Sequence, residues 1–288
     1  MNEVVSQMLG RYPLGSLGDR LRALREVLQQ LALLGLWRAR FYEHAALYGG
    51  TALRVVHGLD RFSEDLDFSL LASDGGFGFD RFNAALQTEL RAHGFEVHVQ
   101  TKVKARRSAI QSTFIKADTR AQLIEIRTPE SLIRGVPPGH TLRITVEVDT
   151  DPPGGFSTEV RYLLSPIPFA VRVFALPDLF AGTLHAVLCR RWRTRVKGRD
   201  WYDLVWFAGH HPELRLEHLE ARMVQSGHWP AGKPLKAARL RERLAATIDA
   251  VDLAQARSEV EPFVRDPDSL ALWSPSFFHD VASRILCV

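Results

Sequence analysis

The stretch Tyr48–Leu70, YGGTALRVVHGLDRFSEDLDFSL, contains the two features on which our prediction of the fold depends. It opens with Gly49 and Gly50, which lie between an apolar run, HAALY, and a helix-like run, TALRVVHG. Near its end, Asp65 and Asp67 interrupt a run of apolar residues. The glycines predict a tight turn into a helix, and the aspartates predict a strand with an unusual charge.

A turn of this kind places backbone N–H groups at the start of a helix, where they have no partner within the helix. Because glycine lets a ligand approach the backbone, such a turn suits a phosphate, and the Thr51 hydroxyl offers another donor. A Gly-Gly pair is more often only a turn. The residues that follow must decide between these two interpretations.

Asp65 and Asp67 are two positions apart, so on a strand both carboxylates project from one face. Two like charges side by side repel unless a cation lies between them, and Mg²⁺ is typically held by one or two carboxylates together with phosphates. The alternative is an exposed strand end with two solvated acids. With the glycine turn about 16 residues upstream, the pair predicts a nucleoside triphosphate site that performs nucleotidyl transfer.

Nucleotidyl transfer commonly uses a third carboxylate on a neighbouring strand. The run RITVEVD supplies Glu147 and Asp149, again two apart, and we choose Glu147 as the third acid. Glu125, in the strand-like run LIEIR, is a competing candidate. Asp149 fits equally well as a turn residue before Pro152.

The rest of the chain predicts an α+β protein, with one sheet flanked by helices and a helical C-terminal part. Alternating polarity predicts strands in 95–105, 112–120 and 142–150. Helical spacing predicts helices from Leu17 to about Phe41, before Gly94, and in 176–192, 200–211, 214–224, 236–251 and 277–286. The Pro- and Gly-rich run 151–168 marks a seam, so we expect domains at 1–165 and 166–288.

The composition is that of a globular protein, with 46% hydrophobic and 24% charged residues in 288. The sequence has no run of about 18 apolar residues and no signal-peptide profile, so we expect a cytoplasmic protein with no membrane partner. Cys189 and Cys287 are far apart, which favours a reducing compartment. We see no metal spacing of His57, His185, His210 and His211 with the cysteines or with each other, and we expect no zinc.

Four segments resemble the AbiEii/AbiGii-type nucleotidyltransferase toxins of type IV toxin–antitoxin systems, members of the DNA polymerase β-like superfamily. GGTALRVVHGLDRFSEDLDF is similar to the first motif of that family, and VEVDTDPPGG to its third-carboxylate strand. LFAGTLHAVLCRRW resembles the nucleotide-gripping helix and VKGRDWYDL the next helical motif. The resemblance covers residues 45 to about 207 and leaves about 80 C-terminal residues without a matched motif.

The resemblance implies a polymerase β-like mixed sheet with flanking helices, followed by a helical domain that completes the active-site cleft. It implies transfer of a nucleoside monophosphate from an NTP to RNA, with the tRNA 3′ end as acceptor, Mg²⁺ or Mn²⁺ as cofactor and an antitoxin as partner. It places Gly49, Gly50 and Thr51 at the triphosphate, and Asp65, Asp67 and Glu147 at the metal.

Three further roles follow from the same resemblance. Asp203 matches the essential acid of the family's R-D-x-x-D-L motif, and the position of Ser63 is linked to control by phosphorylation in related toxins. Asp200, one helical turn before Asp203, orients a neighbour, forms an ion pair with Arg199 or Lys197, or is simply an acid at a helix start.

One position departs from the family pattern. Where the family reads A-x-K-L-H-A, this chain has Thr183 in place of the phosphate-gripping lysine. A threonine donates a hydrogen bond but carries no charge, so nucleotide binding or turnover should be weaker. Arg190, two turns further on, and Lys197 are possible substitutes. A catalytically silent nucleotide- or RNA-binding homologue is therefore an alternative; an Asp-x-Asp glycosyltransferase fits less well, because few residues precede the glycines.

Basic residues gather in two segments that suit a phosphate backbone. One contains Lys102, Lys104, Arg106 and Arg107. The other, which adjoins the predicted site, contains Arg190, Arg191, Arg193, Arg195, Lys197 and Arg199. Trp192 and Trp201 are placed to stack on an unpaired base, so this second segment predicts RNA binding, with a solvated helix end as the alternative.

Overall fold

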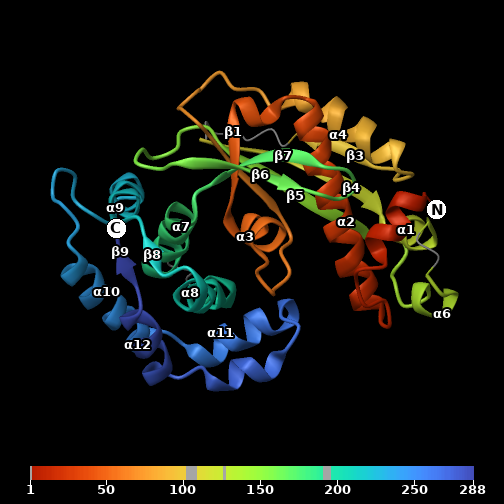
Figure 1. Ribbon diagram of the computed structural model, residues 1–288. Helices are drawn as coiled ribbons and strands as arrows, with labels where there is room; N and C mark the ends of the chain where they lie inside the picture. The colour runs from red at the N-terminus through yellow and green to blue at the C-terminus, as the bar shows by residue number, and fades with distance from the viewer. Residues whose placement is uncertain (1, 102–108, 126–127, 191–195) are drawn as a thin grey trace. The chain divides into compact units, whose positions relative to one another are not determined.

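The computed structural model describes residues 2–101, 109–125, 128–190 and 196–288 (Figure 1). The chain divides into two compact units, each made from more than one segment. Unit 1 consists of Met1–Val56, Ser63–Pro152 and Val160–Val173, and unit 2 of His57–Phe62, Pro153–Glu159 and Phe174–Val288. The single domain boundary expected after residue 165 stays a prediction.

A seven-stranded mixed sheet is the centre of unit 1, in the order β3-β4-β5-β2-β1-β7-β6. The strands are β1 (Ala45–Tyr48), β2 (Leu66–Leu70), β3 (His98–Thr101), β4 (Ile110–Asp118), β5 (Thr141–Asp149), β6 (Thr158–Leu163) and β7 (Phe169–Phe174). β2 runs parallel to β5 and antiparallel to β1, while β4 is antiparallel to both β3 and β5. The strands predicted around 95–105, 112–120 and 142–150 are confirmed as β3, β4 and β5.

The alternation of side chains along β5 separates a buried face from a half-buried face. Leu142, Ile144, Val146 and Val148 are buried, whereas Glu147 and Asp149 lie on the opposite face and are half-buried. Successive side chains of a strand point to opposite faces, so an apolar core on one side leaves the acids on the other. The pattern that predicted the strand therefore also fixes the face that its acids occupy.

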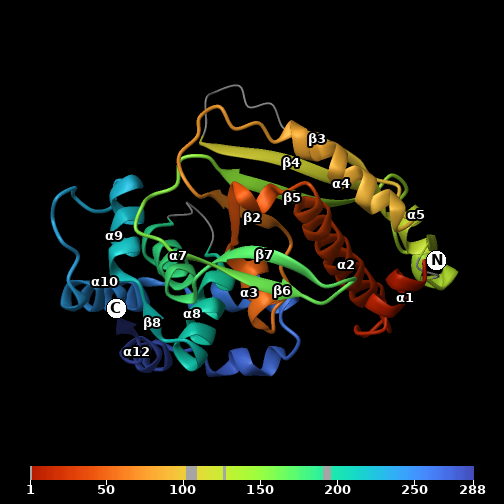
Figure 2. The same ribbon diagram turned by 45° about the horizontal axis from the view of Figure 1, so that its top comes forward.

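Helices flank the sheet in unit 1. They are α1 (Glu3–Leu9), α2 (Leu17–Arg38), α3 (Gly49–His57, its last residue in unit 2), α4 (Asp80–Ala92), α5 (Thr119–Glu125) and α6 (Glu130–Ile133). α2 begins with a reciprocal cap between Ser16 and Asp19, and it packs side by side with α4 (Figures 1 and 2). The helix expected from Leu17 is confirmed, although it ends at Arg38.

Aromatic side chains fill the core behind β2. The ring of Phe41 meets Phe68 and Phe82 edge to face, at 4.9 Å between ring centres in each case. Phe68 is fully buried and is the next residue after Asp67. Edge-to-face pairs of this kind add about 0.5–1.5 kcal/mol beyond the burial of their area. The core thus holds β2 by one face and leaves Asp67 on the other.

Unit 2 is mainly helical. Its helices are α7 (Leu176–Cys189), α8 (Gly198–His210), α9 (Leu216–Gln225), α10 (Ala237–Ala250), α11 (Leu253–Val260) and α12 (Pro275–Ser283), with β8 (Glu213–Leu214) parallel to β9 (Leu286–Cys287). α7 packs against α8 and α9, and α8 packs against α11 and α12. α8 and α11 approach closely at Gly198, where an added Cβ would lie 1.8 Å from the Ala256 carbonyl oxygen.

Most of the predicted elements are confirmed, including Pro177 in the first turn of α7 and the helical C-terminal part. The fold is α+β, with a mixed sheet and flanking helices, as expected. One expectation was wrong: the strand-like run LIEIR lies largely in α5, which ends at Glu125. The Pro- and Gly-rich run 151–168 contains β6, a strand that we did not predict. None of the helices in the described residues is long and apolar enough to span a membrane.

Candidate functional site

Asp67 and Glu147 lie directly beside each other on neighbouring strands of unit 1. The parallel register of β2 and β5 pairs Asp67 with Glu147, and the antiparallel register of β1 and β2 pairs Asp67 with Tyr48. Residues paired in this way point to the same face, with their Cβ atoms about 5 Å apart. Both acids are half-buried. The fold therefore brings together two acids that are 80 positions apart in the sequence.

Asp65, the third predicted acid, lies directly before β2, which begins at Leu66. Its side chain is half-buried, and it is two positions from Asp67, as the predicted shared face requires. Its place at the start of the strand, instead of inside it, differs slightly from our expectation. The three predicted metal acids are thus on adjoining strands or at their ends.

Gly49 allows the start of α3 to lie against Asp67. Its φ is +74°, a backbone conformation that residues other than glycine rarely adopt. A Cβ added there would lie 3.0 Å from Asp67 Oδ2. α3 begins at this glycine. The Asp67 carboxylate and the N-terminus of a helix therefore adjoin each other, which puts a cation ligand next to backbone N–H groups that favour anions.

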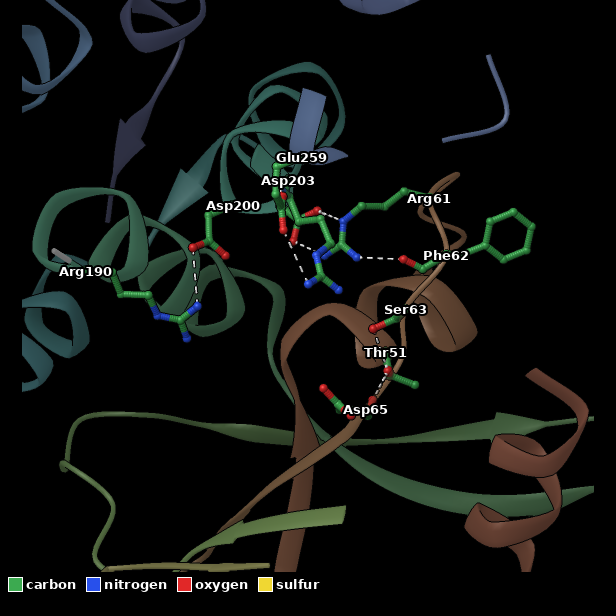
Figure 3. A network of polar contacts seen from close by, with 10 residues as sticks. Thr51, Arg61, Phe62, Ser63, Asp65, Arg190, Asp200, Asp203 and Glu259 are labelled. Atoms are coloured by element: carbon green, nitrogen blue, oxygen red, sulfur yellow. Dashed lines mark hydrogen bonds and ion pairs between the residues drawn. The ribbon is translucent and has the colours of Figure 1, made fainter. Parts of the chain in front are cut away.

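Thr51 holds the segment that leads into β2. The Thr51 side chain is fully buried, and its hydroxyl donates to the Asp65 carbonyl oxygen and is hydrogen-bonded to the Ser63 hydroxyl at 2.8 Å (Figure 3). Gln29 Nε2 donates to the Ser63 carbonyl oxygen at 3.2 Å. These bonds position Asp65, and the expected contact of Thr51 and Ser63 with a nucleotide stays a prediction.

Ser112 is a residue of this site that the sequence analysis missed. It lies opposite Glu147 in the register of β4 and β5, is 2% exposed, and donates its hydroxyl to Glu147 Oε1 at 3.1 Å. Only the strand register reveals this contact, because nothing in the run around Ser112 marks it. Asp149 accepts from the Asp151 backbone N–H at 3.1 Å, which agrees with the alternative role as a turn residue.

These residues fit a magnesium ion. Mg²⁺ prefers oxygen ligands and is usually held by one or two carboxylates and by the phosphates of a substrate. Asp65, Asp67 and Glu147 supply carboxylates, and the helix start at Gly49 would face the phosphates. The glycine that makes room for the Asp67 carboxylate is the structural observation that supports this fit.

In unit 2, Asp203 is buried in an ion pair with Arg61. Arg61 Nε and Nη2 donate to the two Asp203 carboxylate oxygens at 2.6 and 2.5 Å, and each residue is 4% exposed (Figure 3). Burial alone would lower the pKa of Arg61, but the Asp203 carboxylate outweighs it and the pKa is raised. Asp203 acts here as an anchor for Arg61, a residue that the sequence analysis did not single out.

Several residues predicted to contact nucleotide or RNA line one pocket of about 560 Å³ in unit 2. Arg190, Lys197, Asp200 and Trp201 line it together with residues of α7 and α10. Asp200 forms an ion pair with Arg190 at 3.3 Å, and the ion pairs with Arg199 or Lys197 considered above stay a prediction. With Arg243 of α10, the pocket is lined by three cations, one acid and one indole.

Arg199 points to a different partner. Its guanidinium lies 3.5 Å from Glu259 and 4.1 Å from the centre of the Phe263 ring, and its side chain is 14% exposed. Little of the surface of the Arg199 side chain is therefore exposed for contact with RNA. Lys102, Lys104, Arg106, Arg107, Arg191, Trp192, Arg193 and Arg195 lie outside the residues that the structure describes.

Thr183 lies in the second turn of α7 and is half-buried. The guanidinium carbon of Arg222, on α9, is 3.9 Å from the position of a Cβ added at Gly182, the residue before Thr183. Arg222 therefore brings a positive charge to the turn that lacks the family lysine. The sequence analysis considered only Arg190 and Lys197, because the packing of α9 on α7 cannot be seen in local spacing.

Comparisons with known proteins found one matching family model and similar solved structures. The model of the AbiEii nucleotidyl transferase toxin family, of type IV toxin–antitoxin systems, matches residues 31–278. The fold is similar to that of JHP933 from Helicobacter pylori, with a TM-score of 0.52 and 17% identity over 90% of this chain and 89% of that one.

A second H. pylori protein, described provisionally as a nucleotidyltransferase, has a TM-score of 0.47 and 16% identity over 90% of this chain and 92% of that one. No curated protein matches the chain. The match to the family model covers far more than half of the sequence. The chain therefore belongs to the AbiEii nucleotidyl transferase toxin family of type IV toxin–antitoxin systems.

Proposed function

We propose that this protein is an Mg²⁺-dependent nucleotidyltransferase that moves a nucleoside monophosphate from an NTP to an RNA acceptor, the 3′ end of tRNA. The observation that carries the proposal is the pairing of Asp67 with Glu147 on one sheet face, with the helix start at Gly49 against Asp67. Family membership supports the transferase chemistry. The cofactor and the acceptor are our own inference.

In the proposed reaction, the acceptor hydroxyl oxygen attacks the α-phosphorus of the NTP. A new phosphorus–oxygen ester bond forms, the bond between the α-phosphorus and the bridging oxygen breaks, and pyrophosphate leaves. The hydroxyl proton passes to solvent or to one of the site carboxylates. The work of the protein is mainly to position the two reactants and to offset the charge of the phosphates.

Asp65, Asp67 and Glu147 would hold Mg²⁺, which when bound offsets phosphate charge and lowers the pKa of the attacking hydroxyl. Gly49 and Gly50 present the backbone N–H groups of α3 to the triphosphate. Thr51 keeps Asp65 in place through its carbonyl, and Ser112 orients Glu147 through its hydroxyl. Each of these roles uses a contact described above.

Unit 2 contains the other residues that we propose for binding nucleotide or RNA. Its pocket offers Arg190 and Lys197 to phosphate groups and Trp201 to a base, although the indole is largely buried. Asp203 supports this region by holding Arg61. A cognate antitoxin is the protein partner that we propose from membership of a toxin–antitoxin family, to be tested by relief of growth arrest on co-expression.

Thr183 favours a second candidate, a homologue that binds nucleotide or RNA but has lost turnover. A charge-assisted hydrogen bond is roughly twice as strong as a neutral one, so the missing lysine weakens the grip on a phosphate. Membership of a nucleotidyl transferase family is why we favour the active enzyme.

The deciding experiment incubates the protein with each α-labelled NTP, Mg²⁺ and total tRNA. The unaltered chain, Asp65→Ala and Thr183→Lys are compared for label in RNA and for released pyrophosphate. The proposal predicts label with the unaltered chain and none with Asp65→Ala. Label with Thr183→Lys alone would favour the silent homologue, and no label from any of the three would exclude tRNA as the acceptor.

A further inference from the structure

A second cluster of metal-binding side chains lies in unit 2, apart from the acids of the proposed active site. His185, Cys189 and His228 each direct one ligand atom to a common point, and these atoms all lie within 4.8 Å of one another. Cys189 is 4% exposed, and the two histidines are half-buried. Two imidazoles and one thiol form a soft donor set, unlike the carboxylates of unit 1.

The fold explains why these three residues meet. His185 and Cys189 are four positions apart on α7, so they lie on one face of the helix. His228 follows α9, which packs along α7, and its backbone N–H donates to the Met223 carbonyl oxygen at 2.8 Å. The sequence analysis expected no zinc because it overlooked the spacing of His185 and Cys189 and could not foresee His228.

Two guanidinium groups, those of Arg222 and Arg190, lie close enough to His185 to act on it electrostatically. The same positive charges oppose a bound cation, and a Cys189 thiolate would offset them.

A hydrogen-bonded serine, Ser226, lies between the two histidines of the cluster. Ser226 Oγ lies 2.8 Å from His185 Nε2 and 2.9 Å from His228 Nδ1, and it donates to the Met223 carbonyl oxygen at 3.2 Å. A serine bridge explains why the two rings meet. The hydroxyl also provides a fourth polar group at the same point, which a tetrahedral ion requires.

We propose that His185, Cys189 and His228 bind a Zn²⁺ ion, with Ser226 or a water molecule as the fourth ligand. The ion would tie the last turns of α7 to the segment after α9. On binding, the Cys189 thiol loses its proton to solvent and the thiolate sulfur donates to the metal.

The required movement is small. Zinc bonds of 2.0–2.3 Å in a tetrahedron separate neighbouring ligand atoms by about 3.3–3.7 Å. The observed separations, all within 4.8 Å, would close by at most about 1.5 Å. Rotation of the half-buried imidazole rings supplies such a shift without moving the helices.

The test uses the untagged full chain, freed of metal by a chelator, and Co²⁺ as a spectroscopic substitute for Zn²⁺. We expect one equivalent of Co²⁺ to give a thiolate-to-cobalt charge-transfer band and the visible bands of a tetrahedral ion. Zn²⁺ should then remove these bands by displacement. Zn²⁺ should also raise the melting temperature, because a ligand that binds only the native state stabilises it.

Variants locate the ion. Cys189→Ser and His228→Ala should each lower Zn²⁺ affinity by at least about a hundredfold, since loss of a mere outer-shell partner costs 10- to 100-fold. Cys287→Ser, which removes the other cysteine, and His211→Ala are the matched controls and should bind as before. Circular dichroism of each metal-free variant checks the fold, and Cys189→Ala replaces Cys189→Ser if the latter does not fold.

The proposal is overturned if the unaltered chain gives no thiolate band, or if the band survives in Cys189→Ser or depends on Cys287. It is also overturned if His228→Ala binds Zn²⁺ as tightly as the unaltered chain. None of these readouts uses nucleotidyl transfer, so the result is independent of the function proposed for unit 1.

Discussion

The acids of the two units differ in the groups that contact them. In unit 1, Glu147 accepts a hydrogen bond from the neutral Ser112 hydroxyl, and Asp67 lies against the backbone of Gly49. In unit 2, Asp203 is buried against Arg61 with two charge-assisted bonds. Acids grouped on one face serve a ligand that brings positive charge, whereas an acid matched by a buried arginine serves the fold. Changes in the first set should cost activity, and changes in the second should cost stability.

The largest effect expected is on activity, from Asp67→Asn. Removing one carboxylate that holds Mg²⁺ should reduce nucleotidyl transfer on the order of a thousandfold. The reason is that the metal ion, which offsets the negative charge of the phosphates, is held less well. The melting temperature should stay the same or rise, since one of several neighbouring negative charges is removed. Label incorporation into tRNA and thermal unfolding measure the two quantities.

Asp118→Asn is the control for this change. Asp118 is an exposed acid at the end of β4, and the amide keeps the oxygen that accepts from the Ala121 backbone N–H. It should transfer nucleotide at the unaltered rate. If Asp118→Asn and Asp67→Asn lose activity equally, the acids of unit 1 have no special role.

Arg61→Met should destabilise the protein by about 3 kcal/mol, because it leaves the Asp203 carboxylate buried without its partner. The double variant Arg61→Met with Asp203→Leu should recover most of that loss, since no buried charge remains. Urea unfolding of both variants measures the difference. A double variant no more stable than Arg61→Met would contradict the role of this pair as a structural anchor.

Unit 2 should also carry a pH dependence of stability at His218. Burial lowers the pKa of His218 to about 4, against a weaker opposing effect of the Gly154 carbonyl oxygen, which accepts its Nδ1–H at 2.9 Å. Between pH 6.5 and 4 the unfolded chain binds a proton that the folded chain does not. The stabilisation is therefore present above pH 6.5 and is lost as the pH falls.

At pH 5 this loss amounts to about 2 kcal/mol. His218→Gln should remove that part of the pH dependence, which urea unfolding at pH 7 and pH 5 measures in parallel. His279→Gln, an exposed histidine, is the control and should keep the full dependence. Equal slopes in the unaltered chain and His218→Gln would show that His218 titrates normally in the folded protein.

Gly49→Ala separates backbone strain from the contact with Asp67. Gly49 and Gly139 share a φ of +74°, so an alanine at either position costs about 1–2 kcal/mol of strain. The added Cβ meets Asp67 Oδ2 at Gly49 and open space at Gly139. We expect only Gly49→Ala to lower transfer, by about tenfold, because it displaces the carboxylate. Equal activity of the two variants would remove Gly49 from the site.

The smallest effect expected is a gain from Thr183→Lys. A lysine should add about 1 kcal/mol of binding to a phosphate, which is roughly a fivefold lower KM for the NTP. Thr183→Gln, which is long but uncharged, is the control. If neither variant alters KM, Arg222 or another cation already fills this role.

The sequence predicted what depends on short spacing. Helical and strand periodicity gave α2, α4, α7 and β5, and the spacing of Asp65 and Asp67 gave their shared side of the sheet. The short strand β1 was missed because four residues carry too little alternation to be recognised. β6 was missed because the Pro- and Gly-rich composition around it is typical of turns.

Partners that meet only through tertiary packing could not be predicted. Arg61 and Asp203 are 142 positions apart, and Ser112 and Glu147 are 35 apart. His228 and Arg222 come to α7 from the packing of α9, which no local pattern records. The sequence thus supplied the acids of the proposed site, while the structure was needed for the residues that contact them.

The central claim is that Asp67 and Glu147 act together at one metal–nucleotide site. Its most direct test is the rate of nucleotide incorporation into tRNA by the unaltered chain, Asp67→Asn, Glu147→Gln and the double variant. Residues that act as a unit are not additive, so we predict that the double variant is no slower than the slower single variant. Losses that multiply in the double variant, or full activity in Asp67→Asn, would contradict the claim.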